Sequence, residues 1–148
     1  MKKNLTIMAV LFCLIFTMAF PVGAASQVIQ DTETITIVYG DIEVEETLVV
    51  YTDLRSNTKS ADKTHTVKES GKVIAEVTLS ASFGYDGRSS WVESTSSSHT
   101  TYSGWSYGSE KISESGGKAT LSAMLRKPGS SNTPVNISIT CTASGSIS

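Results

Sequence analysis

A regular alternation of apolar and polar residues in the middle of the chain constrains its fold more than any other feature. From Ala75 to Phe83 every second residue is apolar, and the residues between them are polar or small. A period of two is the pattern of a β-strand with one buried face and one solvated face. Further strands are predicted at 34–39, 42–52, 64–69, 105–113, 118–125 and 135–142, and no stretch after residue 25 has helical period. The sequence therefore predicts an all-β domain.

The number of predicted strands favours a sandwich. Seven to nine short strands, separated by turn signals, are typical of two antiparallel sheets packed face to face. We expect an immunoglobulin-like sandwich, with a small β-barrel as the alternative architecture. Polar segments at 54–61 and 127–134 are predicted loops. Residues 93–101 have no apolar face at either parity, so an edge strand and an ordered loop are both compatible with them.

The register of the hairpin after the central strand decides whether Trp91 is buried. A three-residue loop at 85–87 pairs Ala81 with Trp91, which places the indole on the apolar face of the sheet. A two-residue loop at 86–87 places Val92 there instead. We expect the three-residue loop, because an indole buries on the order of 200 Å² and stabilises a small core more than valine does.

The first 25 residues have the features of a secretory signal peptide. Lys2 and Lys3 precede an apolar run at 5–20, and small residues follow up to Ala25. We therefore expect a signal peptide at 1–25, a mobile N-terminal tail at 26–32 and a single domain at 33–148. The predicted localisation is secreted and extracellular, and the short leader favours a bacterial source.

Charge and cysteine content narrow the classes of partner. Without Lys2 and Lys3, 10 of the 12 basic residues remain against 14 acidic ones, a formal charge of −4 that disfavours nucleic acid and anionic membranes as partners. Only Cys141 remains after the predicted cleavage, so no disulfide can form within the chain. Because Cys141 continues the strand spacing of Ile139, we expect a buried thiol rather than a catalytic or dimer-forming one.

No group of residues in the sequence predicts catalysis, a cofactor or a metal site. His65 and His99 stand alone, without a zinc-binding or serine-hydrolase motif. The acidic residues Glu43, Glu45 and Glu46 do not have the spacing of a calcium loop, and we interpret them as charges on a solvated strand edge.

Three aromatic residues form the candidate binding site. Ser103 and Gly104 favour a two-residue turn, which would place Tyr102 opposite Trp105 and gather Tyr107 on the same side. Aromatic rings among hydroxyl groups suit stacking on sugars or anchoring of a protein partner. The alternative is that Trp105 and Tyr107 serve the domain's own core.

These observations predict a secreted, non-catalytic β-sandwich module with a binding or surface-structural role. A glycan, the cell wall or a surface protein is the expected class of partner, and we expect no cofactor, no nucleic acid and no membrane contact of the mature form. Two alternatives stay open. One is a secreted antagonist, either an inhibitor or an antibacterial toxin, and the other is a secreted hydrolase.

Overall fold

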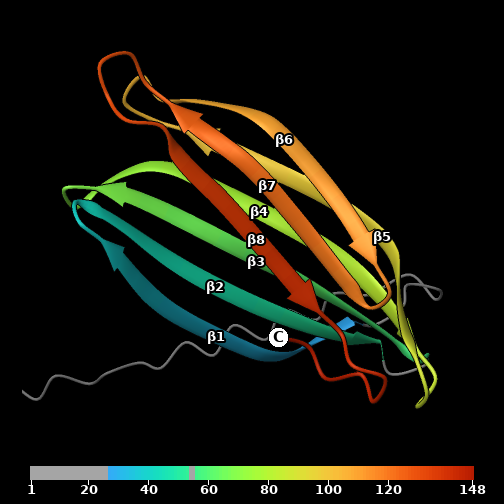
Figure 1. Ribbon diagram of the computed structural model, residues 1–148. Coiled ribbons are helices and arrows are strands. Elements are labelled where there is room, and N and C mark those ends of the chain that lie inside the picture. Colours follow the sequence, from blue (N-terminus) through green and yellow to red (C-terminus); the bar gives the residue numbers. More distant parts are fainter. Residues whose placement is uncertain (1–26, 54–55) are drawn as a thin grey trace, which may run out of the picture.

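The computed structural model describes residues 27–53 and 56–148, so the predicted signal peptide lies outside the described residues. The described chain contains no helix and eight strands (Figure 1). The strands are β1 (Gln27–Tyr39), β2 (Ile42–Asp53), β3 (Thr58–Glu69), β4 (Lys72–Tyr85), β5 (Ser90–Thr101), β6 (Ser106–Ser115), β7 (Lys118–Arg126) and β8 (Thr133–Thr140). In the described part of the chain, no helix has the length and apolar character needed to cross a bilayer.

The strands form two antiparallel sheets that face each other, which confirms the predicted all-β sandwich. Sheet A has the order β1-β2-β3-β4-β5 and sheet B has the order β6-β7-β8. The two layers are separate in Figure 1 and do not close into a barrel. Strand order is consecutive in each sheet, whereas an immunoglobulin fold requires Greek-key connections. The immunoglobulin-like part of the prediction is therefore wrong, and each sheet is a meander instead. Short turns join neighbouring strands, and among the described strands only the link from β5 to β6 passes from one sheet to the other.

Two boundaries predicted from the sequence change in the structure, and one open assignment is decided. Gln27 pairs with Asp53, so residues 27–32, predicted as a tail, form the first half of β1. Strand β3 begins at Thr58 rather than beyond residue 61, because Ala61 faces Ala81 across the inner side of sheet A and both are buried. Residues 93–101 belong to β5, an edge strand of sheet A, which decides between the two alternatives left open for this segment.

The core lies between the inner faces of the two sheets. Strand β4 contributes the alternating residues predicted from the sequence, and Phe83 is completely buried. Strands β7 and β8, with Cys141 directly after β8, contribute the opposite layer: Ala119, Leu121, Ala123, Leu125, Val135, Ile137, Ile139 and Cys141. Cys141 is 2% exposed and not bonded to another cysteine, which confirms the prediction of a buried thiol.

Trp91 is not in this core, so the predicted register of its hairpin is wrong. The turn spans residues 86–89, and the Asp86 carboxylate holds it by accepting hydrogen bonds from the backbone N–H groups of Arg88 and Ser89, at 2.8 and 2.7 Å. Trp91 therefore pairs with Gly84. Val92 faces the core instead, and Trp91 lies on the outer face of sheet A with 43% of its surface exposed.

Many hydroxyl groups lie on the outer face of sheet A. One row crosses all five strands in register, with each residue opposite the next: Thr34, Thr47, Thr64, Thr78 and Ser98. Hydroxyl oxygens of Thr64 and Thr78 are 2.8 Å apart, and those of Thr34 and Thr47 are 3.3 Å apart. Neighbouring strands thus hydrogen-bond through side chains as well as through the backbone.

Candidate functional site

The turn predicted at Ser103 and Gly104 forms, but it does not gather the aromatic residues. Trp105 N–H donates to the Tyr102 carbonyl oxygen at 3.0 Å, and the two central residues have φ values of 55° and 77°. Two positive φ values are typical of a type I′ turn. The turn links β5 of sheet A to β6 of sheet B, so the chain enters a different layer after it and the three rings separate.

Trp105 and Tyr107 belong to the interior, as the alternative interpretation holds. Trp105 is 5% exposed, and its indole Nε1 has no hydrogen-bond partner among the described residues. Tyr107 is half-buried and stacks on His99 with ring centroids 3.9 Å apart. Its hydroxyl donates to Glu110 at 2.5 Å. Burial, together with this carboxylate, raises the pKa of Tyr107 far above its ordinary value.

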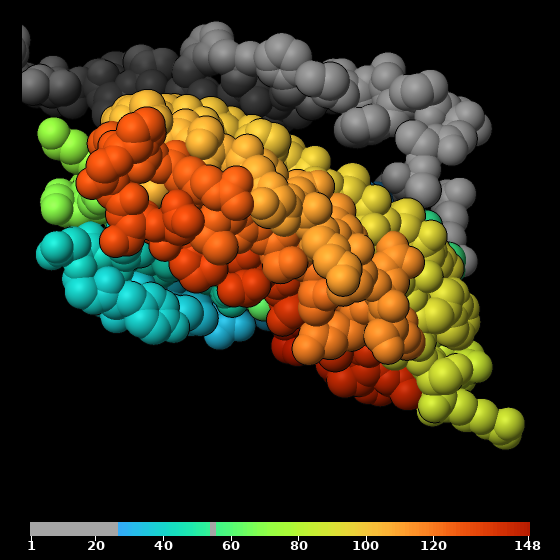
Figure 2. All heavy atoms as spheres, turned by 45° about the horizontal axis from the view of Figure 1, so that its top comes forward, coloured from blue at the N-terminus to red at the C-terminus, as the bar shows by residue number. Residues whose placement is uncertain are grey.

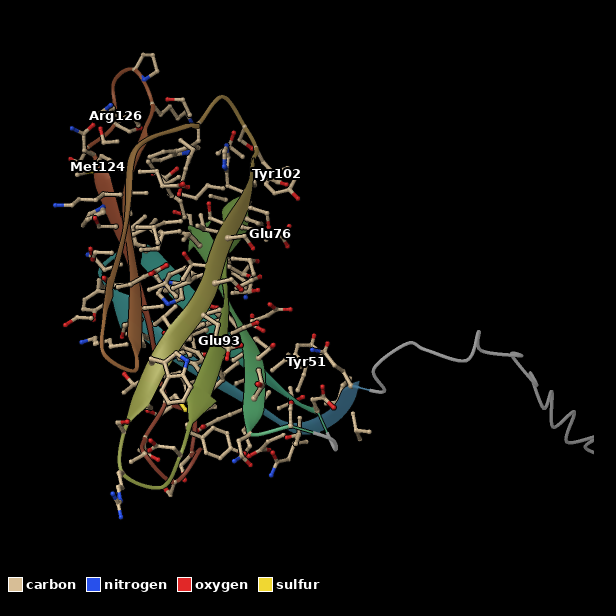
Figure 3. All side chains as sticks on the ribbon, turned by 90° about the vertical axis from the view of Figure 1, so that its right-hand side faces the viewer. Tyr51, Glu76, Glu93, Tyr102, Met124 and Arg126 are labelled. Carbon is tan, nitrogen blue, oxygen red and sulfur yellow. The ribbon has the colours of Figure 1, made fainter. Side chains whose placement is uncertain are left out.

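Tyr102 alone among the three keeps an exposed ring, with 41% of its surface accessible. Its hydroxyl donates to Glu76 at 2.9 Å, and this hydrogen bond raises the pKa of Tyr102. Figure 3 shows Tyr102 and Glu76 on the side of the molecule opposite Met124 and Arg126, hence on the outer face of sheet A. The predicted cluster of three aromatics is therefore not a surface site.

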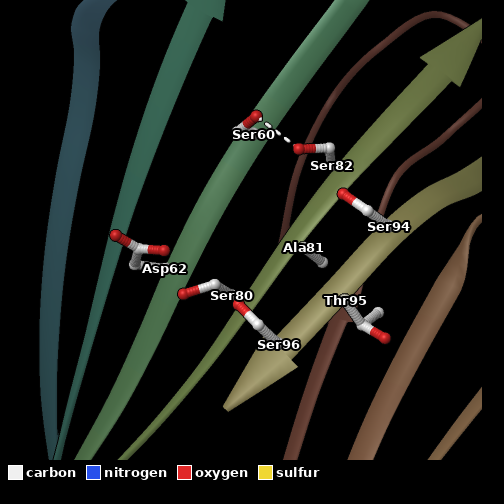
Figure 4. Close-up of a pocket in the computed structure, with 8 residues that line it drawn as sticks. All are labelled: Ser60, Asp62, Ser80, Ala81, Ser82, Ser94, Thr95 and Ser96. Atoms are coloured by element: carbon white, nitrogen blue, oxygen red, sulfur yellow. Dashed lines mark hydrogen bonds between the residues drawn. The ribbon is translucent and has the colours of Figure 1, made fainter. Parts of the chain in front are cut away.

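A different polar site lies on the outer face of sheet A, and we call it the serine hollow. It encloses about 250 Å³ where β3, β4 and β5 present small side chains (Figure 4). Its lining residues are Ser60, Asp62, Ser80, Ala81, Ser82, Ser94, Thr95 and Ser96. Ser60 and Ser82 hydroxyls are 2.8 Å apart and bridge the first two strands. The hollow exists because serine alternates on three adjacent strands, so no long side chain fills the space.

An exposed indole and a carboxylate accompany the serine hollow. Gly84 follows Ser82 by two residues on the same face of β4, and the indole of Trp91 covers it: a Cβ at Gly84 would lie 2.4 Å from ring atoms Cε2 and Cζ2. Asp62 is part of the lining, and Tyr51 donates to its Oδ2 at 3.3 Å. Hydroxyl, carboxylate and aromatic groups therefore lie on the same face of sheet A.

Sequence reasoning missed the serine hollow because each of its residues reads as an ordinary outward-facing serine. The available signal was Gly84 within an otherwise regular strand, since a strand glycine often marks a close approach by another group. Only the register that pairs Gly84 with Trp91, and Ser82 with Ser94, brings these residues together.

A second, larger hollow lies between the sheets, and we call it the β1–β8 cleft. It encloses about 550 Å³ and is lined by Ile37, Tyr39, Ile42, Val44, Glu46, His65, residues 131–134 and Asn136. In Figure 2 the β1–β2 turn, in cyan, and the loop after β7, in orange-red, lie at the same end of the molecule. Ile37, Ile42 and Val44 give the cleft an aliphatic wall, and a polar group that includes Glu46 and His65 adjoins this wall.

That polar group consists of Glu46, His65 and Lys63. Glu46 Oε2 is 2.6 Å from His65 Nε2, and its other oxygen is 3.3 Å from Lys63 Nζ. Burial opposes ionisation of Glu46, but the hydrogen bond to His65 and the charge of Lys63 outweigh it, so the pKa of Glu46 lies below its ordinary value. The His65–Glu46 pair provides the histidine and carboxylate that the hydrolase alternative requires. Among hydrogen bonds between described residues, none links His65 to a hydroxyl or a thiol.

The acidic residues of β2 are paired rather than placed on a strand edge, which corrects the interpretation made from the sequence. β2 lies between β1 and β3. Glu43 and Glu45 each accept a hydrogen bond from Lys68 Nζ at 2.9 Å on the outer face, while Glu46 points inward. Within residues 27–53 and 56–148, no group of three or more potential ligands could hold a metal ion.

The serine hollow and the β1–β8 cleft are thus two candidate sites on opposite faces of sheet A. Comparison of the chain with protein-family models, with curated proteins and with solved structures finds no match.

Proposed function

We propose that this protein is a secreted, non-catalytic module that binds a neutral polysaccharide through the serine hollow and Trp91. The observation that carries the proposal is the position of an exposed indole beside a hollow lined by hydroxyl groups and one carboxylate. Serine hydroxyls both donate and accept hydrogen bonds, so they match the hydroxyl groups of a sugar. The apolar face of a sugar ring stacks on an aromatic ring.

The charges around the hollow favour a neutral chain over an acidic one. Asp62 lines the hollow, and Glu93 is exposed in the same strand as Trp91. A carboxylate accepts hydrogen bonds from sugar hydroxyls but repels uronic acid or phosphate groups at short range. Neutral hexose and N-acetylhexosamine chains are therefore the ligand class that this surface fits.

Retention on insoluble polysaccharides tests the proposal. Purified mature protein is incubated with cellulose and chitin, and polygalacturonate serves as the acidic comparison. We expect retention on at least one neutral polysaccharide and none on polygalacturonate. The fluorescence of Trp91 should change on binding, since the second tryptophan, Trp105, is buried away from the surface.

Two variants locate the binding. Trp91→Ala should reduce retention at least tenfold, and Ser96→Glu should do the same by filling the hollow and adding charge at an exposed position of an edge strand. Tyr39→Ala is the matched control, because Tyr39 is also an exposed aromatic but lies in the β1–β8 cleft. Absence of retention on every neutral polysaccharide, or retention that survives both site variants, would contradict the proposal.

A further inference from the structure

The inner face of sheet A extends beyond sheet B. Strand β8, at the edge of sheet B, packs over β3, so none of the described strands lies opposite the inner sides of β1 and β2 along part of their length. Leu48 and Val50, in the second half of β2, are buried. Ile42 and Val44, in its first half, are only half-buried, and Ile37 of β1 beside them is half-buried too. These three side chains form the aliphatic wall of the β1–β8 cleft.

Part of a fourth strand of sheet B is already present. After β8 the chain turns and returns along the free edge of that strand, as the C-terminal end in Figure 1 shows. Ile147 pairs with Cys141 in antiparallel orientation, and Ile147 packs against the core. Thr140 N–H donates to the Ser148 carbonyl at 2.8 Å, and Ser148 N–H donates back at 2.9 Å. Residues 146–148 therefore occupy one end of a strand position beside β8.

The remainder of this strand position lies at the β1–β8 cleft. Backbone groups alternate sides along a strand, so those of Asn136 and Ser138 point to the same side as those of Thr140. No described strand pairs with them there. Pro134, two residues before Asn136, faces the same side and has no N–H group to donate. Proline within a sheet is usually found on an edge strand. The cleft thus combines unpaired backbone groups on β8 with an aliphatic wall on β1 and β2.

We propose that the β1–β8 cleft accepts an extended segment of another polypeptide, which adds to β8 as an antiparallel strand in continuation of residues 146–148. Backbone hydrogen bonds hold such a segment, and alternate side chains point into the cleft. Those side chains should be neutral and apolar, since they face Ile37, Ile42 and Val44. The carboxylate of Glu46 does not call for a basic ligand residue, because Lys63 and His65 already pair with it. This partner is separate from the polysaccharide and binds the opposite face of sheet A.

A short extension added after Ser148 tests whether the β1–β8 cleft accepts a strand, and the natural partner need not be known. Ile147 faces the core, so the first residue after Ser148 would also face inward. A seven-residue tail of alternating valine and threonine, beginning with valine, then places its valines in the cleft. The same tail shifted by one residue, beginning with threonine, places its valines outward and is the matched control.

We expect the matched tail to raise the melting temperature by about 5 °C or more, given the sensitivity of domains of this size. It should also slow amide hydrogen exchange at Asn136 and Ser138. The shifted tail should do neither. Ile37→Lys, in the cleft wall, should cancel the effect of the matched tail, whereas Val38→Lys, on the opposite face of the same strand, should preserve it. Equal effects of the two tails, or unchanged exchange at Asn136 and Ser138, would overturn the proposal.

Native mass spectrometry of the protein without an added tail shows whether the strand that adds to β8 comes from another polypeptide or from a second copy of this chain. A monomer in native mass spectrometry is expected if another polypeptide supplies it. A dimer that the matched tail dissociates would assign the strand to a second copy of this chain and overturn the assignment to another polypeptide. Retention on polysaccharide should be the same with and without the tail, so failure of this proposal and failure of the polysaccharide proposal give different results.

Discussion

Replacement of Gly84 by alanine tests the position of Trp91 directly. A Cβ at Gly84 would lie 2.4 Å from two atoms of the indole, well inside van der Waals contact. Gly84 does not have a positive φ, so alanine is compatible with the backbone, and the three closest atoms to the new Cβ all belong to the indole. The methyl group must therefore displace the ring from the outer face of sheet A.

The burial of Trp91 sets the size of the effect. The residue is 43% exposed, so a little over half of its surface is covered. For a side chain that buries about 200 Å² in full, this corresponds to roughly 3 kcal/mol at about 25 cal/mol per Å², as an upper value. Partial displacement of the ring by Gly84→Ala should then lower the free energy of unfolding by about 1 to 2 kcal/mol.

Once the indole is removed, Gly84→Ala should raise the free energy of unfolding instead of lowering it. In a Trp91→Ala background the three closest contacts of the new methyl group, all of them with the indole, are removed, and alanine in a strand is favoured over glycine by roughly 0.5 to 1 kcal/mol. Urea denaturation of the wild type, the two single variants and the double variant measures this coupling. Gly108→Ala is the control, because its Cβ would approach nothing closer than Arg126 Nη1 at 3.7 Å, and it should be neutral or slightly stabilising. An equal cost of Gly84→Ala in both backgrounds would show that the indole does not cover Gly84.

Three further predictions follow from buried groups. Trp105→Ala should destabilise the domain by about 3 to 5 kcal/mol in urea denaturation, whereas Trp105→Phe should cost about 1 kcal/mol or less, because it also removes the unpaired indole N–H. Cys141 should react slowly with a thiol reagent in the native protein, since burial raises its pKa and hides the sulfur; rapid labelling would contradict this. Glu46 has a lowered pKa, so its stabilising effect is complete above the ordinary value of 4.5 and is lost as the pH falls through the folded-state pKa. Melting temperatures should therefore fall less steeply below pH 4.5 for Glu46→Gln than for the wild type, and parallel curves would exclude this role.

The sequence predicts the strands of this fold well because a period of two depends only on local order. The alternation of Ala119, Leu121 and Ala123 identifies a buried face whatever the neighbouring strand is, and the structure confirms it. The glycine at 104 likewise predicts its turn, because the positive φ that the turn requires is a local property.

Register and sheet membership are less accessible because they depend on distant contacts. The carboxylate of Asp86 holds a longer turn before β5, so Trp91 pairs with Gly84 and its indole lies on the outer face; a bulge beyond Val92 then pairs Ser82 with Ser94. Residues on either side of the turn at 103–104 enter different sheets because Trp105 packs into the core. The serine hollow combines residues of three strands and depends on the register between β4 and β5, so no single stretch of sequence predicts it.

The two proposed surfaces should act independently, because sheet A separates them. Trp91 lies on the outer face of β5 and Ile37 on the inner face of β1, at opposite edges of the five-stranded sheet. Four inter-strand spacings of about 4.8 Å place these strands roughly 19 Å apart. Substitutions at such separation, without shared partners, usually have additive effects. We therefore expect Ile37→Lys to leave polysaccharide retention unchanged, and Trp91→Ala to leave the melting-temperature increase from the matched tail unchanged. A loss of either effect in the other variant would mean that the two faces are coupled through β2, β3 and β4, and that a single ligand site cannot be assigned to either face alone.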